Sequence, residues 1–222
     1  ENCRKGFKDP RQGIETCGMV EMMLSTETLY AITGDRSWAD ICEDVAFNSY
    51  PAALTADMKA LRYITSPNQV QADSTSKSPG IQNDGPMFMM SPYNFRCCQH
   101  NQGQGWPYFT EHLWMATADN GLVAALYAAN EVTAKVGKDV TVSITEKTTY
   151  PFDNKIELTI NPSAKTAFPL YLRVPGWCKK PSVAINGKNF PLNTVANLIK
   201  INKSWEKGDV VTLILPMEIG LR

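Results

Sequence analysis

The chain has 222 residues, 43% of them hydrophobic, which predicts one or two globular domains with a sizeable core. Its 22 basic and 22 acidic residues cancel, so bulk electrostatics favours no polyanionic partner and we expect no nucleic-acid binding. No stretch has the roughly 20 consecutive apolar residues of a membrane-spanning helix, and we expect no membrane span. The chain begins at Glu1 without an initiating Met or an apolar leader, so we expect a fragment or a processed form.

Two amphipathic helices are predicted near the start of the chain. The first covers Ile14–Thr33, where apolar residues recur at spacings of three and four, and Gly34 follows as its stop signal. The second has Ser37 as its expected cap and ends before Pro51, because a proline disfavours the helical conformation of the preceding residue.

A long loop and a third helix follow in the predicted order. Residues Ser66 to Pro92 are rich in Ser, Pro, Gly, Asn and Asp, which indicates a functional or mobile loop. The third helix is expected to start at Pro107, in its first turn, and to end before Asn120-Gly121. Three helices make an incomplete helical unit, so we expect the missing helices upstream.

The hydrophobic period changes near Gly121, which divides the chain into predicted domains 1–121 and 122–222. Short alternating apolar runs then indicate antiparallel strands of a β-sandwich: Val140–Ile144, Ile156–Ile160, Leu170–Val174, Val183–Ile185 and Val210–Leu215. Between two short runs, Asn186-Gly187 predicts a two-residue hairpin turn, because both turn positions need a positive φ.

Two short segments carry the residues with the clearest chemical potential. Glu15 stands two residues before Cys17, and Cys97 is adjacent to Cys98. Three thiolates and one carboxylate are a set that suits tetrahedral zinc. Residues i and i+2 of a helix point about 200° apart, so Glu15 and Cys17 can bind the same metal ion only in extended or first-turn backbone. Cys97 and Cys98 would point to opposite faces of a flat strand, so they are expected where the chain turns, in a turn that residues 99–105 would supply.

Spacing alone leaves other interpretations of these cysteines open. They could be buried free thiols, since cysteine is often buried, or Cys97 and Cys98 could form a bond with each other in a redox-sensing domain. His100 is a possible substitute ligand, although a hydrogen-bonded neighbour is the more common role. The usual paired C-x-x-C signatures of zinc sites are absent.

Two blocks resemble the signature motifs of glycoside hydrolase family 127: Gly13–Cys17 with the helix after it, and Arg96–Asn101. Gly103–Pro107 and Ala116–Leu122 are similar to a bacterial branch of that group. The resemblance covers nearly the whole chain. It implies a mixed α+β architecture, in which the end of an (α/α) helical barrel is followed by a β-sandwich.

The resemblance also implies a function and its residues. The family's zinc is bound by one Glu and three Cys, which correspond to Glu15, Cys17, Cys97 and Cys98 here, and Cys97 corresponds to the nucleophile. The implied enzyme is a retaining glycosidase that removes L-arabinofuranose-type sugars from plant glycans. The family's general acid/base corresponds most nearly to Glu1, and Tyr63 aligns with a tyrosine near the active site.

The alternative function is a non-catalytic carbohydrate-binding fragment in which zinc has only a structural role. A closed site of four protein ligands is typical of structural zinc. The family's upstream sugar-binding residues are not in this sequence, which leaves open whether the chain acts alone. The exact sugar, the linkage and the oligomeric state also stay open. Export of plant-glycan enzymes favours the bacterial periplasm or cell envelope, whereas an intact thiolate cluster favours a reducing compartment.

Overall fold

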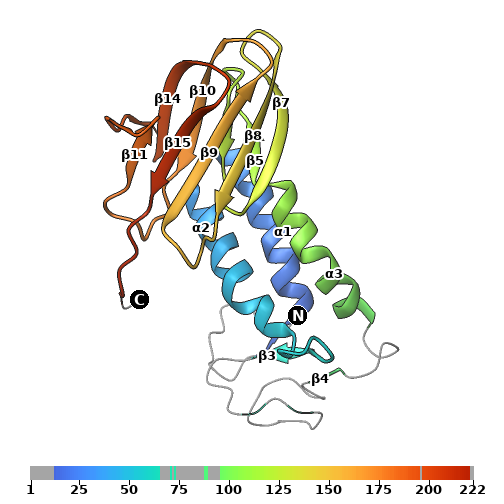
Figure 1. The fold of residues 1–222 in the computed structure, drawn as a ribbon. Helices are drawn as coiled ribbons and strands as arrows, with labels where there is room; N and C mark the ends of the chain where they lie inside the picture. Colours follow the sequence, from blue (N-terminus) through green and yellow to red (C-terminus); the bar gives the residue numbers. More distant parts are fainter. Residues whose placement is uncertain are drawn as a thin grey trace. The chain divides into compact units, whose positions relative to one another are not determined.

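The computed structural model describes residues 13–65, 71, 73, 88–89, 96–195 and 197–220 (Figure 1). The chain forms two compact units. The first contains residues 1–28 and 41–110, and the second contains residues 29–40 and 111–222. Within the described residues, no helix combines the length and the apolar character needed to cross a membrane. The domain boundary at Gly121 stays a prediction.

Among the described residues, the first part of the chain contains three α-helices and several short elements. In chain order they are β1 (Ile14–Glu15), α1 (Thr16–Thr33), α2 (Arg36–Asp44), a π-helical turn (Val45–Ser49), a 3-10 turn (Pro51–Ala53), β2 (Leu61–Arg62), β3 (Ile64–Thr65), β4 (Phe88–Met89) and α3 (Arg96–Glu111). Two small antiparallel sheets pair β1 with β3 and β2 with β4. The predicted loop from Ser66 to Pro92 falls mostly outside the described residues.

The first two helices lie close to their predicted positions, with two differences at their ends. α1 starts at Thr16, because Ile14 and Glu15 are extended and pair with β3. The predicted cap Ser37 is wrong, because the carboxylate of Asp35 accepts a hydrogen bond from the Ser37 N–H at 2.9 Å. A side-chain oxygen that accepts from an N–H two residues later is the usual N-cap arrangement.

The prediction for the third helix is wrong at both ends. α3 runs from Arg96 to Glu111 with Pro107 inside it, and Trp114–Ala116 forms strand β5. Two glycines and a proline weaken the helical signal of this segment, since each has a poor helix propensity. The cysteine pair therefore lies in the first turn of a helix, and the turn expected over residues 99–105 is helical.

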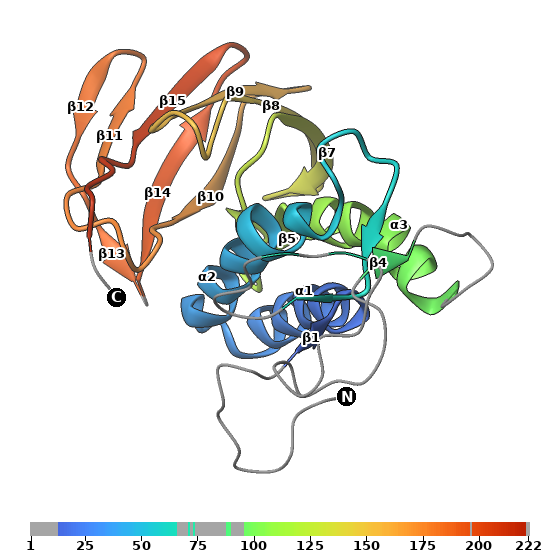
Figure 2. The same cartoon turned by 90° about the horizontal axis from the view of Figure 1, so that it is seen from below.

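Two sheets form the rest of the chain, and Figures 1 and 2 both show β10 and β14 in a layer beside β9 and β15. The five-stranded sheet has the order β13-β14-β10-β6-β5 and the six-stranded sheet the order β12-β11-β15-β9-β8-β7. The strands not yet bounded are β6 (Leu122–Ala124), β7 (Asn130–Val136), β8 (Val140–Thr148), β9 (Lys155–Pro162), β10 (Thr166–Arg173), β11 (Ser182–Ile185), β12 (Lys188–Phe190), β13 (Thr194–Val195), β14 (Leu198–Trp205) and β15 (Asp209–Ile214).

All five predicted strands are present, but the pairing is not wholly antiparallel. β6 pairs with β10 in parallel, with Leu122 opposite Leu170. Along β9 alternate residues are buried (Ile156, Leu158 and Ile160), as expected when one face of a sheet packs on a core. The predicted hairpin is confirmed: Ile185 pairs with Lys188 across Asn186-Gly187, whose φ angles are 51° and 74°.

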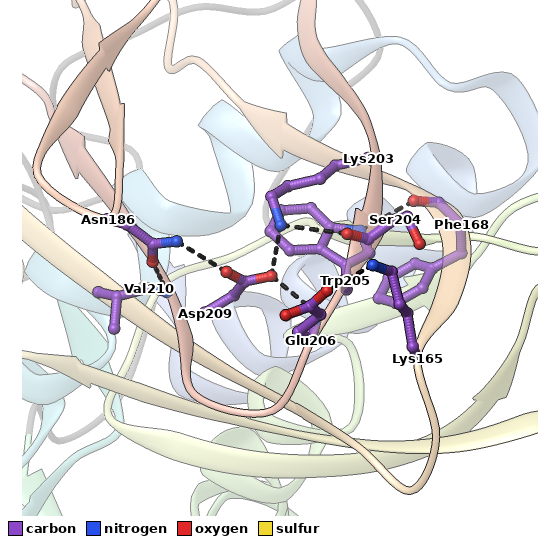
Figure 3. Close-up of polar contacts among 9 residues, drawn as sticks. All are labelled: Lys165, Phe168, Asn186, Lys203, Ser204, Trp205, Glu206, Asp209 and Val210. Carbon is purple, nitrogen blue, oxygen red and sulfur yellow. Dashed lines mark hydrogen bonds and ion pairs between the residues drawn. The ribbon is translucent and has the colours of Figure 1, made fainter.

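A buried carboxylate fastens this hairpin to the turn between β14 and β15 (Figure 3). Asp209 accepts hydrogen bonds from Asn186 Nδ2 at 2.7 Å, Lys203 Nζ at 2.5 Å and the Glu206 N–H at 2.9 Å. Asn186 Oδ1 in turn accepts from the Val210 N–H at 2.8 Å. Because β14 belongs to one sheet and β11 and β15 to the other, this cluster connects the two sheets.

An ion pair joins the helical residues of the second unit to its strands. Arg173, fully buried on β10, donates to Asp40 Oδ1 at 2.6 Å and to the Ala125 carbonyl at 2.5 Å. The other oxygen of Asp40 accepts from the Gly176 N–H at 2.9 Å. A buried guanidinium needs such partners, because an unpaired buried charge is strongly destabilising.

Candidate metal centre

Glu15 and Cys17 are placed by the change from strand to helix at the start of α1. Glu15 pairs with Ile64 on β3, and the Thr16 N–H donates to the Tyr63 carbonyl at 3.1 Å. The Thr16 hydroxyl donates to the Arg62 carbonyl at 2.6 Å. Glu15 is therefore extended while Cys17 lies in the first helical turn, a geometry in which both residues can bind the same metal ion.

Cys97 and Cys98 are placed by the first turn of α3. Adjacent residues on a helix point about 100° apart, so two neighbours in one turn can both reach a point beside the helix. Cys98 is fully buried and packs with Met19, Ala53 and Leu61. Cys97 is exposed, as expected for a residue one step further around the helix.

The structure brings the two segments together. One donor atom from each of Glu15, Cys17, Cys97 and Cys98 lies within 4.8 Å of all the others. Cys98 Sγ is 3.2 Å from Glu15 Oε1 and 3.3 Å from Cys17 Sγ, and Cys97 Sγ is 3.9 Å from Glu15 Oε1. Glu15 and Cys98 are buried, Cys17 is partly buried, and the five described cysteines are all free thiols.

The electrostatics of the cluster favour a bound cation. Burial raises the pKa of the Cys17 thiol to about 12, and the Glu15 carboxylate adds to the shift. Burial, with hydrogen bonds to Cys17 and Glu15, raises the pKa of Cys98 well above the usual range. A divalent cation would reverse this penalty, because metal binding deprotonates a coordinating thiol. Three thiols and one carboxylate converging at one point fit the donor set of zinc.

The other predicted site residues do not belong to the group of four converging donors. Tyr63 packs against the cluster of Met19, Ala53, Leu61 and Cys98, and its carbonyl positions Thr16. His100 is exposed on α3 and is not among the four converging residues. Glu1, the proposed acid/base, lies outside the described residues.

Arg62 is a supporting residue that sequence reasoning missed. Its guanidinium donates to the carbonyls of Ala52 and Leu54, at 2.5 and 2.8 Å, while its own carbonyl accepts from Thr16. One residue thus links the start of α1 to the 3-10 turn. The fold alone brings these residues together, and no motif or spacing in the sequence indicates the contact.

Comparison with known families decides the relationship. Residues 1–111, half of the chain, match the GH127 catalytic domain of β-L-arabinofuranosidases, and residues 121–217 match the GH127 middle domain. The chain belongs to glycoside hydrolase family 127. The resemblance found in the two sequence blocks is therefore confirmed. The members of this family are glycosidases.

Solved structures of glycoside hydrolases share the fold. A GH127 β-L-arabinofuranosidase from Geobacillus stearothermophilus T6 superposes with a TM-score of 0.84 and 24% identity over 96% of this chain. A structure described as a glycoside hydrolase gives a TM-score of 0.77 and 29% identity, and a GH127 β-arabinofuranosidase gives 0.73 and 21%, each over 92% of this chain. The chain spans 33%, 33% and 32% of these three proteins. No curated protein sequence matches it.

Proposed function

We propose that this chain is part of a retaining glycoside hydrolase that removes β-L-arabinofuranose from plant glycans. Family membership supports the reaction class, and the cluster of one carboxylate and three thiols supports the chemistry. Glu15, Cys17, Cys97 and Cys98 would hold Zn²⁺. When bound, the ion keeps the sulfurs deprotonated at neutral pH, where a free thiol with a pKa near 8.5 is mostly protonated.

The same proposal extends to the fold. The helices of residues 1–121 would be the end of an (α/α) barrel whose remaining helices lie in other parts of the full-length protein. Residues 122–222 would form a β-sandwich domain. The length of the solved relatives, about three times that of this chain, supports the first point. The alternating burial along the strands supports the second.

One observation carries the assignment of Cys97 as nucleophile: it is the exposed member of the cluster. Glu15 and Cys98 are buried and Cys17 is partly buried, so these three suit a holding role. A sugar can approach a sulfur only from solvent. Because Cys97 is an exposed residue whose Sγ lies 3.9 Å from Glu15 Oε1, it combines contact with the cluster and access to substrate.

The reaction would proceed by two displacements at the anomeric carbon. The Cys97 sulfur attacks this carbon and forms a C–S bond, the C–O bond to the glycan breaks, and the Glu1 carboxyl protonates the departing oxygen. Water then attacks the same carbon, the Glu1 carboxylate takes a proton from it, and the C–S bond breaks. Two inversions leave the sugar with its original configuration, as in other retaining glycosidases.

Replacement of Cys97 by serine tests this proposal in the full-length protein. We expect Cys97→Ser to reduce hydrolysis of an aryl β-L-arabinofuranoside by at least about 10³-fold, because a hydroxyl is a much weaker nucleophile than a thiolate. With the parent enzyme and a slow substrate, mass spectrometry should find one sugar on the peptide that contains Cys97.

Two further variants separate this function from the carbohydrate-binding alternative. Cys98→Ser should lose metal as well as activity, whereas Cys42→Ser, at a buried thiol that contacts Glu27 outside the cluster, should retain both. If Cys97→Ser keeps its turnover while zinc remains bound, Cys97 is not the nucleophile. The structural-zinc interpretation would then be favoured.

A further inference from the structure

Tyr50 reaches from the end of the π-helical turn into the backbone of α3. Its hydroxyl donates to the Gln102 carbonyl at 2.5 Å. Residues 102 and 106 are hydrogen-bond partners in a regular helix, since each N–H bonds to the carbonyl four residues earlier. The Tyr50 hydroxyl therefore bonds to a carbonyl of the α3 hydrogen-bond ladder, and a side chain that enters such a ladder fixes or bends the helix locally.

The residues around Tyr50 pack closely against its ring. A Cβ at Gly105 would lie 2.4 Å from Tyr50 Cζ and 2.7 Å from its hydroxyl, so only glycine leaves room for the ring. Trp106 packs edge-on against the same ring, with centroids 5.2 Å apart. Tyr50 is almost completely buried. Its hydroxyl consequently has one position, set by α3 on one side and by the turn on the other.

The residues after Tyr50 contact the ligand-bearing turns. The Tyr50 carbonyl accepts from the Ala53 N–H at 3.1 Å, and Ala53 belongs to the same buried cluster as Cys98. Cys98 and Gln102 are four residues apart and share one face of α3, so the segment touches two successive turns of that face. Through Arg62, which donates to Ala52 and Leu54, the same segment is tied to the start of α1.

We propose that Tyr50 is a positioning residue: its hydroxyl, bonded to the Gln102 carbonyl beside Gly105, holds the Cys97–Cys98 turn against Glu15 and Cys17. This inference rests on the proposed function, since it concerns how the ligand set of that site is held. Tyr50 acts through the backbone of α3, and the loss of one hydroxyl should therefore change the geometry of the cluster.

Tyr50→Phe tests the inference, because it removes the hydroxyl and keeps the ring. Cobalt(II) is the probe, since its visible spectrum reports the geometry and the number of thiolate ligands. We expect Tyr50→Phe to weaken cobalt binding by about tenfold or more, because the ligand-bearing turn of α3 loses an anchor, and to alter the thiolate-to-cobalt band. Tyr108→Phe is the matched control, since it removes another α3 phenol, whose hydroxyl donates to the Gln104 side chain at 3.0 Å. It should bind cobalt like the parent.

A second readout needs no metal. Diamide oxidises two nearby thiols to a disulfide and takes up their two hydrogens, and Cys17 and Cys98 have their sulfurs 3.3 Å apart. Mass spectrometry should show this disulfide forming several-fold more slowly in metal-free Tyr50→Phe than in the parent or in Tyr108→Phe. A parent that takes up no cobalt would contradict the proposed function, yet the diamide rates would still test Tyr50.

Gly105→Ala gives an independent variant, in case Tyr50→Phe does not fold. The added methyl displaces the ring without removing its hydroxyl, and we expect it to weaken cobalt binding and slow the disulfide in the same way. A purely structural role would lower the melting temperature and leave the cobalt spectrum and the oxidation rate unchanged. That result, in either folded variant, would overturn the inference.

Discussion

Cys97 and Cys98 show how much depends on the orientation of single residues. They are adjacent in the sequence, yet one is exposed and the other is completely buried among Met19, Ala53 and Leu61. A step of about 100° around α3 accounts for the difference. The two thiols can therefore have separate roles, Cys98 as an anchored ligand and Cys97 as a ligand that substrate can reach.

Glu146 is a second residue whose surroundings control its protonation. It is buried on β8, where its Oε2 accepts from Asn130 Nδ2 at 3.0 Å, and none of the described residues hydrogen-bonds its Oε1. Burial raises the pKa of Glu146 to about 8, although hydrogen bonds from Asn130 and the Ala128 N–H oppose the shift. The folded protein thus keeps a proton that the unfolded chain releases near pH 4.3.

This difference predicts a pH-dependent stability. Because the folded state binds the extra proton between roughly pH 4.3 and 8, the contribution of Glu146 to the free energy of unfolding is fully present below that range. It falls by about 1.4 kcal/mol per pH unit as the pH rises. Glu146→Gln, which cannot ionise, should remove this slope.

Denaturant unfolding of the parent and of Glu146→Gln between pH 5 and 8 would measure the difference. The variant should gain stability relative to the parent as the pH rises. Glu157→Gln on the neighbouring strand is the control, since its partly exposed carboxylate pairs with Lys155 at 2.8 Å and its pKa is lowered by that pair. A constant difference between parent and Glu146→Gln at all pH values would show that Glu146 is ionised in the folded state.

At the scale of elements, α3 is where sequence reasoning failed and where the reason is clearest. Gly103, Gly105 and Pro107 all argue against a helix, and the helix was predicted to start only at Pro107. Gly105 is present because the ring of Tyr50 occupies the space of a side chain. A long-range contact thus explains a residue that local propensity treats as a helix breaker, and no local pattern could reveal it.

Other elements were predictable because their signals are local. The hairpin at Asn186-Gly187 follows from the two positive φ angles its turn requires. The requirement that Glu15 and Cys17 both reach one ion predicted extended or first-turn backbone there, although the expected helix began at Ile14. Strand β14 alternates its buried residues Ile199 and Ile201 with polar ones, a signal that was present but not used. The parallel pairing of β6 with β10 has no such local signal.

The hydrogen bonds around Asp209 join the hairpin after β11 to β14 and β15 (Figure 3). Although burial opposes it, hydrogen bonds from the Glu206 N–H, Lys203 and Asn186 lower the pKa of Asp209. Asp209→Ala leaves these donors without their acceptor, which should cost about 1–3 kcal/mol of stability.

Denaturant unfolding would measure this cost. Glu206→Ala is the matched control, because it breaks the neighbouring ion pair with Lys165, whose two side chains are 60% and 65% exposed. An exposed pair of this kind should contribute under about 1 kcal/mol. Equal losses in the two variants would mean that Asp209 does not connect the sheets more strongly than a surface ion pair does.

At the scale of the whole molecule, the proposed site joins segments that are far apart in the sequence. Cys17 and Cys98 are separated by 81 positions, so their sulfurs meet only in the folded unit. Sequence motifs could name the four ligands through the family resemblance, but only the fold brings them within 4.8 Å of one another. A metal that binds such a site binds the folded state alone and stabilises it.

Zinc-edge X-ray absorption spectroscopy of the purified full-length protein is the most direct test of this account, because it counts the ligands of the ion itself. We predict one zinc per chain, with three sulfur neighbours at about 2.3 Å and one oxygen neighbour at about 2.0–2.2 Å. Cys98→Ser should lose this signal. A protein that holds no zinc, or a zinc surrounded by nitrogen and oxygen without sulfur, would contradict the assignment of the metal centre and of Cys97 as the nucleophile.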